Sequence, residues 1–516
     1  MHRKDVETIK QSRPILIAVL GAVVSVLAFP PFGPGILIVP GITLFLLALR
    51  LSGSRRQGLT VGMVYGLVFF GGVMWWLAEL ELLALILVPV QAGFFLLYGW
   101  WLARYNHHAP VTWLVLAMGG WAVMEVIRYH FPVGGLEWGA AGYALSDNRY
   151  LRLPAAAIGT SGLTIVVVMV SGVLALTLAR DWDRRLLWSV PIVVLAWAAT
   201  APSALSPIDH GPRTATIVQG STPCPFEHCP PDERRRTYEM HLALTEAIVP
   251  GSTDLVVWSE GSTGSTNADP VLNDDVRESI AAQARRIGSP MLVGGDRVVS
   301  DTEWVNANVY FDAEGQILGE YRKQHPVPFG EYIPWRPLFG WIPALAQVPR
   351  DMIPGDGPVV FEDGVGSVIS FEGGFSRYPH QARKAGATVI VVATNEASYG
   401  PDAPTSEQFI GMTRMRAVEL GVPVIHAAVT GMSTIIDNQG SFSDMTGLGT
   451  EEVLSGELGV SAMTPFITIG NMVMYLAGLL GLATWARLRW VVGSGAMQSP
   501  ADPMRSDSAP QSIEED

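Results

Sequence analysis

The first 200 residues of the chain form a series of apolar segments separated by short polar joints. About 20 apolar residues are enough to cross a bilayer as a helix, so a chain with several such segments is expected to fold partly within a membrane. Seven segments lie in the first 200 residues and an eighth lies near the end: 14–29, 35–49, 58–78, 82–103, 111–127, 154–179, 187–199 and 465–486. Two of the eight are short for a membrane span. A signal peptide does not account for the first segment, because further apolar segments follow it directly. The low share of charged residues, 16%, fits this interpretation.

The basic residues of the joints predict how these segments are oriented. If all eight segments span, five sets of basic residues fall on one side: Lys4 with Arg13, Arg50 with Arg55 and Arg56, Arg104, Arg180 with Arg184 and Arg185, and Arg487 with Arg489. Cytoplasmic joints are enriched in Lys and Arg, so this side is expected to be the cytoplasm. Arg128, Arg149 and Arg152 fall on the other side, so the rule holds only as a bias. The polar region 201–463 is therefore expected to face outward.

The region 201–463 alternates short apolar strands with helices. We expect strands at 215–219, 255–258, 291–294, 309–311, 367–369, 388–393, 423–427 and 433–437, and helices at 232–248, 274–287, 378–385 and 406–420. Buried strands interleaved with helices predict an α/β layered fold. The expected organisation is a membrane domain of seven helices (1–200), an extracytoplasmic α/β domain (201–463), an eighth transmembrane helix (464–490) and a disordered cytoplasmic tail (491–516).

Charge and cysteine content narrow the possible partners. The formal net charge of −13 argues against a nucleic-acid partner, which would favour a basic face. The two cysteines, Cys224 and Cys229, are too few for a disulfide framework. They form either a local disulfide, if the segment lies outside the cytosol, or two free thiols. No cluster of His, Cys and Asp has the spacing of metal ligands, so neither a metal nor an organic cofactor is expected.

A candidate nucleophile lies at the end of one predicted strand. The buried residues 367–369 run into Ser370, and Glu372 follows two residues later, where strand alternation would return it to the same side. Gly373 and Gly374 then allow a sharp turn. A strand that delivers a hydroxyl residue to a tight turn is one way to present a catalytic side chain.

Two further strand ends carry charged residues. The apolar strand 255–258 leads to Glu260, and the Pro- and aromatic-rich run 321–334 carries Lys323 and Glu331. A carboxylate can act as general base, an ammonium can stabilise an oxyanion, and a hydroxyl can act as nucleophile. Each residue alone is more typical of a solvated strand end or an inert loop, but the three in one domain indicate an acyl-transfer site.

These motifs resemble a known family. The order of Glu260, Lys323 and a nucleophile is similar to the carbon–nitrogen hydrolase (nitrilase) superfamily. The run from Tyr321 to Pro334, combined with eight apolar segments, resembles the apolipoprotein N-acyltransferases in particular. The resemblance extends from 30–33 to the last apolar segment, and Asn306, the stretch 394–400 with Asn395, and the stretch 412–419 also match.

The resemblance implies a nitrilase-like αββα sandwich and a two-step reaction. The family moves an acyl chain from a membrane phospholipid to an active-site Cys and then to the α-amine of a diacylglyceryl-cysteine at the N-terminus of an apolipoprotein. Carried over by motif, Glu260 is the general base, Lys323 stabilises the oxyanion, and Ser370 stands at the nucleophile position. Glu331, Glu372, Asn306 and Asn395 would support them. The implied setting is a multi-pass protein of the cell membrane with its catalytic domain outside the cytoplasm, and we expect a monomer.

The chain departs from the family pattern at several positions. Ser370 replaces the family's Cys, Ser259 stands where Pro is usual, Ser398 where Trp is usual and Val429 where Asn is usual. The lysine–tryptophan pair expected after the first strand is missing from 221–230. A hydroxyl needs stronger activation than a thiol, although a Lys beside a Ser can supply it in other folds.

Three interpretations therefore stay open. In the first, the protein is an N-acyltransferase whose nucleophile is Ser370, either as its natural residue or as a substitution for Cys. In the second, it is a catalytically impaired homologue that binds lipid or lipoprotein without transferring acyl groups. The third is a membrane-tethered amidase or esterase.

Overall fold

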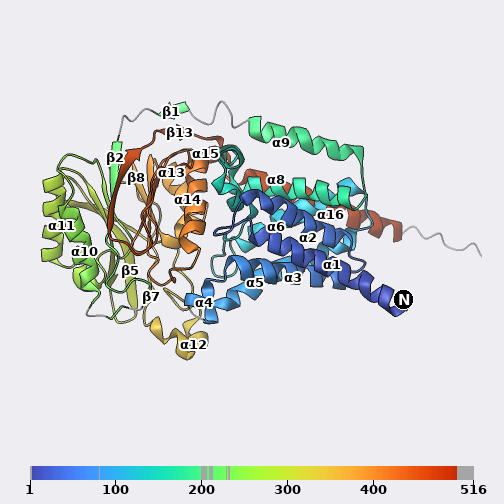
Figure 1. Ribbon diagram of the computed structural model, residues 1–516, viewed down its shortest axis with the longest axis horizontal. Coiled ribbons are helices and arrows are strands. Elements are labelled where there is room, and N and C mark those ends of the chain that lie inside the picture. The colour runs from blue at the N-terminus through green and yellow to red at the C-terminus, as the bar shows by residue number, and fades with distance from the viewer. Residues whose placement is uncertain are drawn as a thin grey trace, which may run out of the picture.

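The computed structural model describes residues 3–80, 82–198, 206–208, 213–227, 229–230 and 233–496, and it has a helical part and an α/β part side by side along its long axis (Figure 1). Glu81 and the final segment 497–516, which includes most of the expected tail, lie outside the described residues.

Each of the eight predicted apolar segments contains at least one helix. The helices of this part are α1 (Arg3–Val26), α2 (Ile38–Arg50), α3 (Arg55–Val73), α4 (Leu77–Leu80), α5 (Leu87–Leu102), α6 (Pro110–Arg128), α7 (Arg149–Arg152), α8 (Ala155–Leu178), α9 (Ser189–Ala198), α15 (Pro465–Ile469) and α16 (Met472–Ala496). Among the described residues, three helical stretches are long and apolar enough to cross a membrane, namely Ala84–Tyr105, Pro110–Arg128 and Ala155–Leu178, and two shorter apolar helices cover Ser12–Val26 and Gly35–Arg50. The eighth segment differs from the prediction, because Gly470 breaks it into α15 and α16 and α16 continues to Ala496.

Glycines allow these helices to pack with their backbones in contact. A Cβ added to Gly62 of α3 would lie 2.1 Å from the carbonyl oxygen of Phe95 in α5. A Cβ added to Gly119 of α6 would lie 2.4 Å from the Cα of Gly481 in α16. Small residues at such crossings are typical of helix pairs in membranes, where close van der Waals contact replaces the hydrophobic driving force.

The α/β part contains two main sheets. Its strands are β1 (Ser206–Ile208), β2 (Arg213–Gln219), β3 (Val256–Trp258), β4 (Met291–Val298), β5 (Glu303–Phe311), β6 (Ile317–Arg322), β7 (Asp351–Met352), β8 (Val365–Ile369), β9 (Val389–Thr394), β10 (Val424–Ala428), β11 (Thr434–Ile436), β12 (Glu452–Leu458) and β13 (Ser461–Met463). The larger sheet has the order β12-β2-β3-β4-β5-β6 with β7 beside β5, the smaller has the order β11-β10-β9-β8, and β1 pairs with β13.

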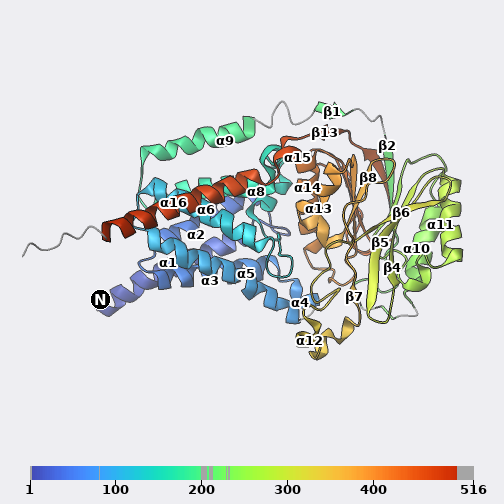
Figure 2. The same ribbon diagram turned by 180° about the vertical axis from the view of Figure 1, so that it is seen from behind.

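The two sheets pack face to face and helices cover both outer faces. Side chains from both sheets, such as Ile217 and Val391, form one buried cluster between them. Helices α10 (Arg235–Glu246) and α11 (Asp274–Ile287) cover the larger sheet, whereas α13 (Arg377–Lys384) and α14 (Thr405–Leu420) lie between the smaller sheet and the membrane-type helices (Figures 1 and 2). Phe409 and Met415 of α14 belong to the same hydrophobic cluster as Trp138 and Tyr143, so the cores of the two parts are continuous.

The prediction of an α/β layered domain is confirmed, and all eight expected strands and all four expected helices are present, with bounds shifted at most positions. Five strands were not predicted from the sequence, namely β1, β6, β7, β12 and β13. Strand β12 alternates exposed and half-buried residues at the edge of the larger sheet, so it lacks the continuous apolar run that marked the buried strands. The structure joins Cys224 and Cys229 by a disulfide, which decides between the two alternatives for this pair.

Candidate active site

Ser370 lies where β8 ends and a 3-10 turn, Ser370–Gly374, begins. Its φ of 49° falls in the left-handed region, which is uncommon for residues other than glycine. A strained residue on a sharp turn after a strand is typical of a side chain that is presented for function. The expectation that strand alternation brings Glu372 back to the side of Ser370 is wrong, because the strand stops at Ile369 and the turn coils back.

Glu372 is fully buried and holds this turn in place. Its carboxylate accepts four hydrogen bonds: from the backbone N–H groups of Ile369 at 2.8 Å, Gln324 at 2.5 Å and His325 at 2.9 Å, and from the hydroxyl of Tyr321 at 2.7 Å. Burial raises the pKa of Glu372 to about 7, while the donors favour the charged form and oppose this rise. The contacts connect the turn of Ser370 to the segment that follows β6.

Lys323 is the first residue after β6, and it lies buried between two carboxylates. Its Nζ donates to Oε1 of Glu331 at 2.6 Å and to Oε1 of Glu260 at 3.2 Å. Burial lowers the pKa of Lys323, but the attraction of Glu260 and Glu331 outweighs it and holds the pKa above its ordinary value. Lys323 therefore stays protonated at neutral pH. It is a fixed ammonium that can stabilise negative charge, and it has no free lone pair with which to act as a base.

Glu260 is oriented by the same network. Its Oε1 also accepts from the side-chain amide of Asn306 at 2.7 Å, and its Oε2 accepts from the backbone N–H of Asn395 at 2.8 Å. Glu260 follows β3, Asn306 lies in β5 and Asn395 follows β9, so strands of both sheets supply the site. The structure thus brings five of the predicted site residues into one hydrogen-bonded cluster: Glu260, Lys323, Glu331, Asn306 and Asn395.

Ser370 is linked to this cluster indirectly. Within the part of the chain that the structure describes, its hydroxyl makes no hydrogen bond with Glu260 or Lys323. The connection runs through Glu372, whose carboxylate accepts from the backbone next to both Ser370 and Lys323. Burial raises the pKa of Glu372, and the charge of Lys323 opposes part of this rise. The seven predicted residues therefore form a carboxylate–ammonium cluster and the turn of Ser370, joined by Glu372.

The sequence analysis missed Asp296. This residue lies in β4 after Gly294 and Gly295, and its Oδ1 is buried without a hydrogen-bond partner among the described residues. Burial, followed by the charges of Glu260 and Glu331, raises the pKa of Asp296 to about 7. A carboxylate two residues after an apolar strand was available as a signal, but sequence proximity does not show that β4 places it beside Glu260.

The site is in contact with the helical part. Gln408 of α14 accepts a hydrogen bond from Trp138 Nε1 at 2.7 Å and donates to the carbonyl oxygen of Pro30 at 3.0 Å. The backbone N–H of Gly400, in the loop after Asn395, donates to Glu79 at 2.7 Å. The joints 30–33 and 130–139 thus lie against the α/β domain.

Comparison with known proteins agrees with this architecture. A model of the apolipoprotein N-acyltransferase N-terminal domain matches residues 21–173, and a carbon–nitrogen hydrolase model matches residues 214–467. An apolipoprotein N-acyltransferase from Geobacter metallireducens is 27% identical over 92% of this chain and 95% of its own length, and one from Photobacterium profundum is 25% identical over 91% and 93%. The chain belongs to the apolipoprotein N-acyltransferase family.

In this member of the apolipoprotein N-acyltransferase family, one match lies in the helical part and the other covers the α/β part. The carbon–nitrogen hydrolase match contains every predicted site residue, from Glu260 to Asn395, and the N-terminal match contains α2 to α7 and most of α8. Among solved structures, an amidase from Nesterenkonia sp. aligns with 53% of this chain and 98% of its own, at 15% identity and a TM-score of 0.37.

Proposed function

We propose that this member of the apolipoprotein N-acyltransferase family transfers an acyl chain from a membrane phospholipid to the α-amine of an N-terminal diacylglyceryl-cysteine. The observation that carries the proposal is the buried cluster of Glu260, Lys323 and Glu331, tied through Glu372 to the turn of Ser370. The cluster lies in a domain that packs directly on apolar helices, where an acyl donor and a lipidated acceptor can both arrive.

The first step forms an ester on Ser370. The hydroxyl oxygen attacks the ester carbonyl of the phospholipid while Glu260 takes its proton, and the ammonium of Lys323 stabilises the oxyanion. The lysophospholipid oxygen leaves and takes the proton back from Glu260. In the second step the α-amine attacks the Ser370 ester, its proton passes through Glu260 to the Ser370 oxygen, and an amide forms.

We also propose that all eight apolar segments span the cell membrane and that the α/β domain faces outward. Hydrogen bonds from the α/β domain reach the joints at Pro30 and Trp138, which fall on one side under this topology. The protein is proposed to act as a monomer, because the described site is built within one chain.

Mass spectrometry of the intact protein tests the acyl-enzyme. The full-length protein is incubated with phospholipid, and a mass increase of one acyl group on Ser370 is expected. Ser370→Ala is expected to show none, and Ser370→Cys is expected to form a thioester that neutral hydroxylamine cleaves. An adduct that persists in Ser370→Ala, or turnover of a soluble amide without lipid, contradicts the proposal.

One observation favours a second candidate, a homologue that binds lipid or lipoprotein without transferring acyl groups. The Ser370 hydroxyl has no hydrogen bond to Glu260 among the described residues, and a neutral hydroxyl is a poor nucleophile without a base in contact. This candidate predicts that phospholipid raises the melting temperature while neither the wild type nor Ser370→Cys gains an acyl mass.

A further inference from the structure

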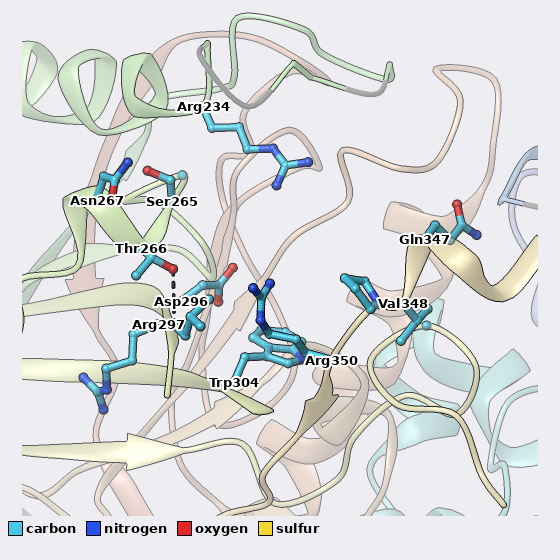
Figure 3. A pocket seen from close by; sticks show the side chains of 14 residues that line it. Arg234, Ser265, Thr266, Asn267, Asp296, Arg297, Trp304, Gln347, Val348 and Arg350 are labelled. Atoms are coloured by element: carbon cyan, nitrogen blue, oxygen red, sulfur yellow. Dashed lines mark hydrogen bonds between the residues drawn. The ribbon is translucent and has the colours of Figure 1, made fainter. Parts of the chain in front are cut away.

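A cavity of about 400 Å³ opens beside the carboxylate cluster (Figure 3). Its wall includes Arg234, Arg350, Trp304 and Asp296. Trp304 Nε1 donates to the carbonyl oxygen of Glu331 at 3.3 Å, so the wall of the cavity is continuous with the candidate active site. The volume lies in the range of pockets that enclose a small ligand or a short segment of a larger one.

Asp296 gives the cavity an acceptor without a donor. Its Oδ1 is buried and has no partner among the described residues, and buried polar atoms of this kind are rare unless a ligand or water supplies the missing hydrogen bond. Gly261, the neighbour of Glu260, lies close to this carboxylate, because a Cβ added to it would lie 3.7 Å from Asp296 Oδ2 and 3.1 Å from Asn395 Nδ2. An N–H group of a bound ligand would satisfy Asp296.

Two arginines add positive charge to the same cavity. Arg234 Nε donates to the carbonyl oxygen of Cys229 at 3.3 Å, and Arg350 Nε donates to that of Ser300 at 3.2 Å. Neither forms an ion pair with a carboxylate in the described part of the chain, unlike Arg297, which is held by Asp269 and Glu320. In a chain of net charge −13, a site with two such cations favours an anionic group.

The location of the cavity favours a polypeptide over a lipid headgroup as its occupant. Most of its lining residues belong to or adjoin α10, β4, β5 and β7, which lie beyond α4 and α12 (Arg336–Phe339) as seen from the helical part (Figures 1 and 2). A lipid headgroup stays at the membrane surface, whereas the polypeptide attached to a lipidated N-terminus extends away from it.

We infer that this cavity receives the first residues of the acceptor polypeptide behind its lipidated cysteine, and that Arg234 and Arg350 select acceptors with acidic side chains there. Asp296 accepts a hydrogen bond from a backbone N–H of that segment. The inference rests on the proposed function for the identity of the acceptor, but binding of the acceptor does not require acyl transfer.

The test measures binding by fluorescence anisotropy on the full-length protein in detergent. The probes are diacylglyceryl-cysteine peptides with the same lipid, followed by two Asp, two Asn or two Lys residues. The wild type is expected to bind the Asp peptide about tenfold more tightly than the Asn peptide, and the Lys peptide more weakly than both. The double variant Arg234→Gln/Arg350→Gln is expected to bind the three alike, while Arg285→Gln, an exposed arginine of α11, keeps the wild-type order.

The outcomes separate this inference from the proposed function. Equal affinities of the wild type for the three peptides, or an unchanged order in the double variant, overturn the inference. A double variant that changes the preference between anionic and zwitterionic phospholipids, with the peptide order intact, also overturns it and assigns the cavity to a headgroup. Asp296→Asn is expected to weaken all three peptides by a similar factor. Charge-dependent binding without any acyl adduct on Ser370 supports the inference and contradicts the proposed function.

Discussion

The hydroxyl of Tyr143, in the helical part, donates a hydrogen bond of 2.9 Å to the carbonyl oxygen of Gly374, the last residue of the turn that carries Ser370. The same hydroxyl lies 3.0 Å from Glu137 and accepts from Arg416 at 2.9 Å. The turn of Ser370 is thus held through Glu372 to the segment after β6, and through Gly374 to the helical part. The proposed acyl transfer from a membrane lipid would use this coupling, because Ser370 would then keep a fixed position relative to the bilayer.

Tyr143→Phe is expected to loosen this attachment. The substitution leaves the carbonyl of Gly374 without this donor at a buried site, which costs about 1–3 kcal/mol of stability. The expected result is a lower melting temperature and a slower rate of acyl-adduct formation. Tyr150→Phe is the matched control, since Tyr150 is 74% exposed and its side chain lies at the surface. Equal melting temperatures and rates for the two variants would show that the contact has no role.

Lys323→Met is expected to be strongly destabilising as well as inactive. Removing the ammonium leaves Glu260 and Glu331 buried without their counter-charge, and breaking a buried ion pair costs about 3–5 kcal/mol. Burial already raises the pKa of Glu331, and the loss of the opposing charge of Lys323 is expected to raise it further. The measurement is thermal unfolding at pH 6 and pH 8, with a larger deficit expected at pH 8. Lys384→Met, at an exposed lysine at the end of α13, is expected to unfold like the wild type.

Asp296→Asn is expected to change the pH dependence of stability. The pKa of Asp296 is raised to about 7 from an ordinary value of 3.8, so the folded protein holds a proton that the unfolded chain releases. The stabilisation from this proton is full below pH 4 and is lost as the pH rises toward 7. The wild-type melting temperature should therefore fall over this window relative to that of Asp296→Asn, and the variant should be more stable at pH 8 by up to about 4 kcal/mol. Asp301→Asn, at an exposed loop position, serves as the control.

The outward orientation predicts that the cysteine pair is accessible from outside. After mild reduction of right-side-out membrane vesicles, Cys224 and Cys229 are expected to react with a membrane-impermeant maleimide. In a background that lacks both cysteines, Arg55→Cys tests the joint between the second and third segments and is expected to react only after the vesicles are permeabilised. Labelling of Arg55→Cys in intact vesicles would reverse the proposed orientation.

Features that depend on local composition could be predicted without the structure. Continuous apolar runs identified all eight helical segments, because hydropathy does not depend on the tertiary fold. Buried strands such as β8 and β9 were equally clear, since both have buried side chains along their length. Glu260, Lys323 and Ser370 were also found from sequence, because each follows directly on such a strand or lies within a distinctive motif.

The tertiary structure alone decided how these residues act on one another. Asp296 reaches the site only because β4 pairs with β3, and Glu372 turns back toward Gln324 only because a 3-10 turn replaces the expected strand. The contact between Tyr143 and Gly374 joins residues 231 positions apart. Such contacts depend on the packing of whole sheets and helices, and the pKa of a carboxylate depends on that packing through burial and neighbouring charges. For this protein seven residues of the candidate site could be picked out from the sequence, whereas Asp296 and the coupling of the site to the helical part could not.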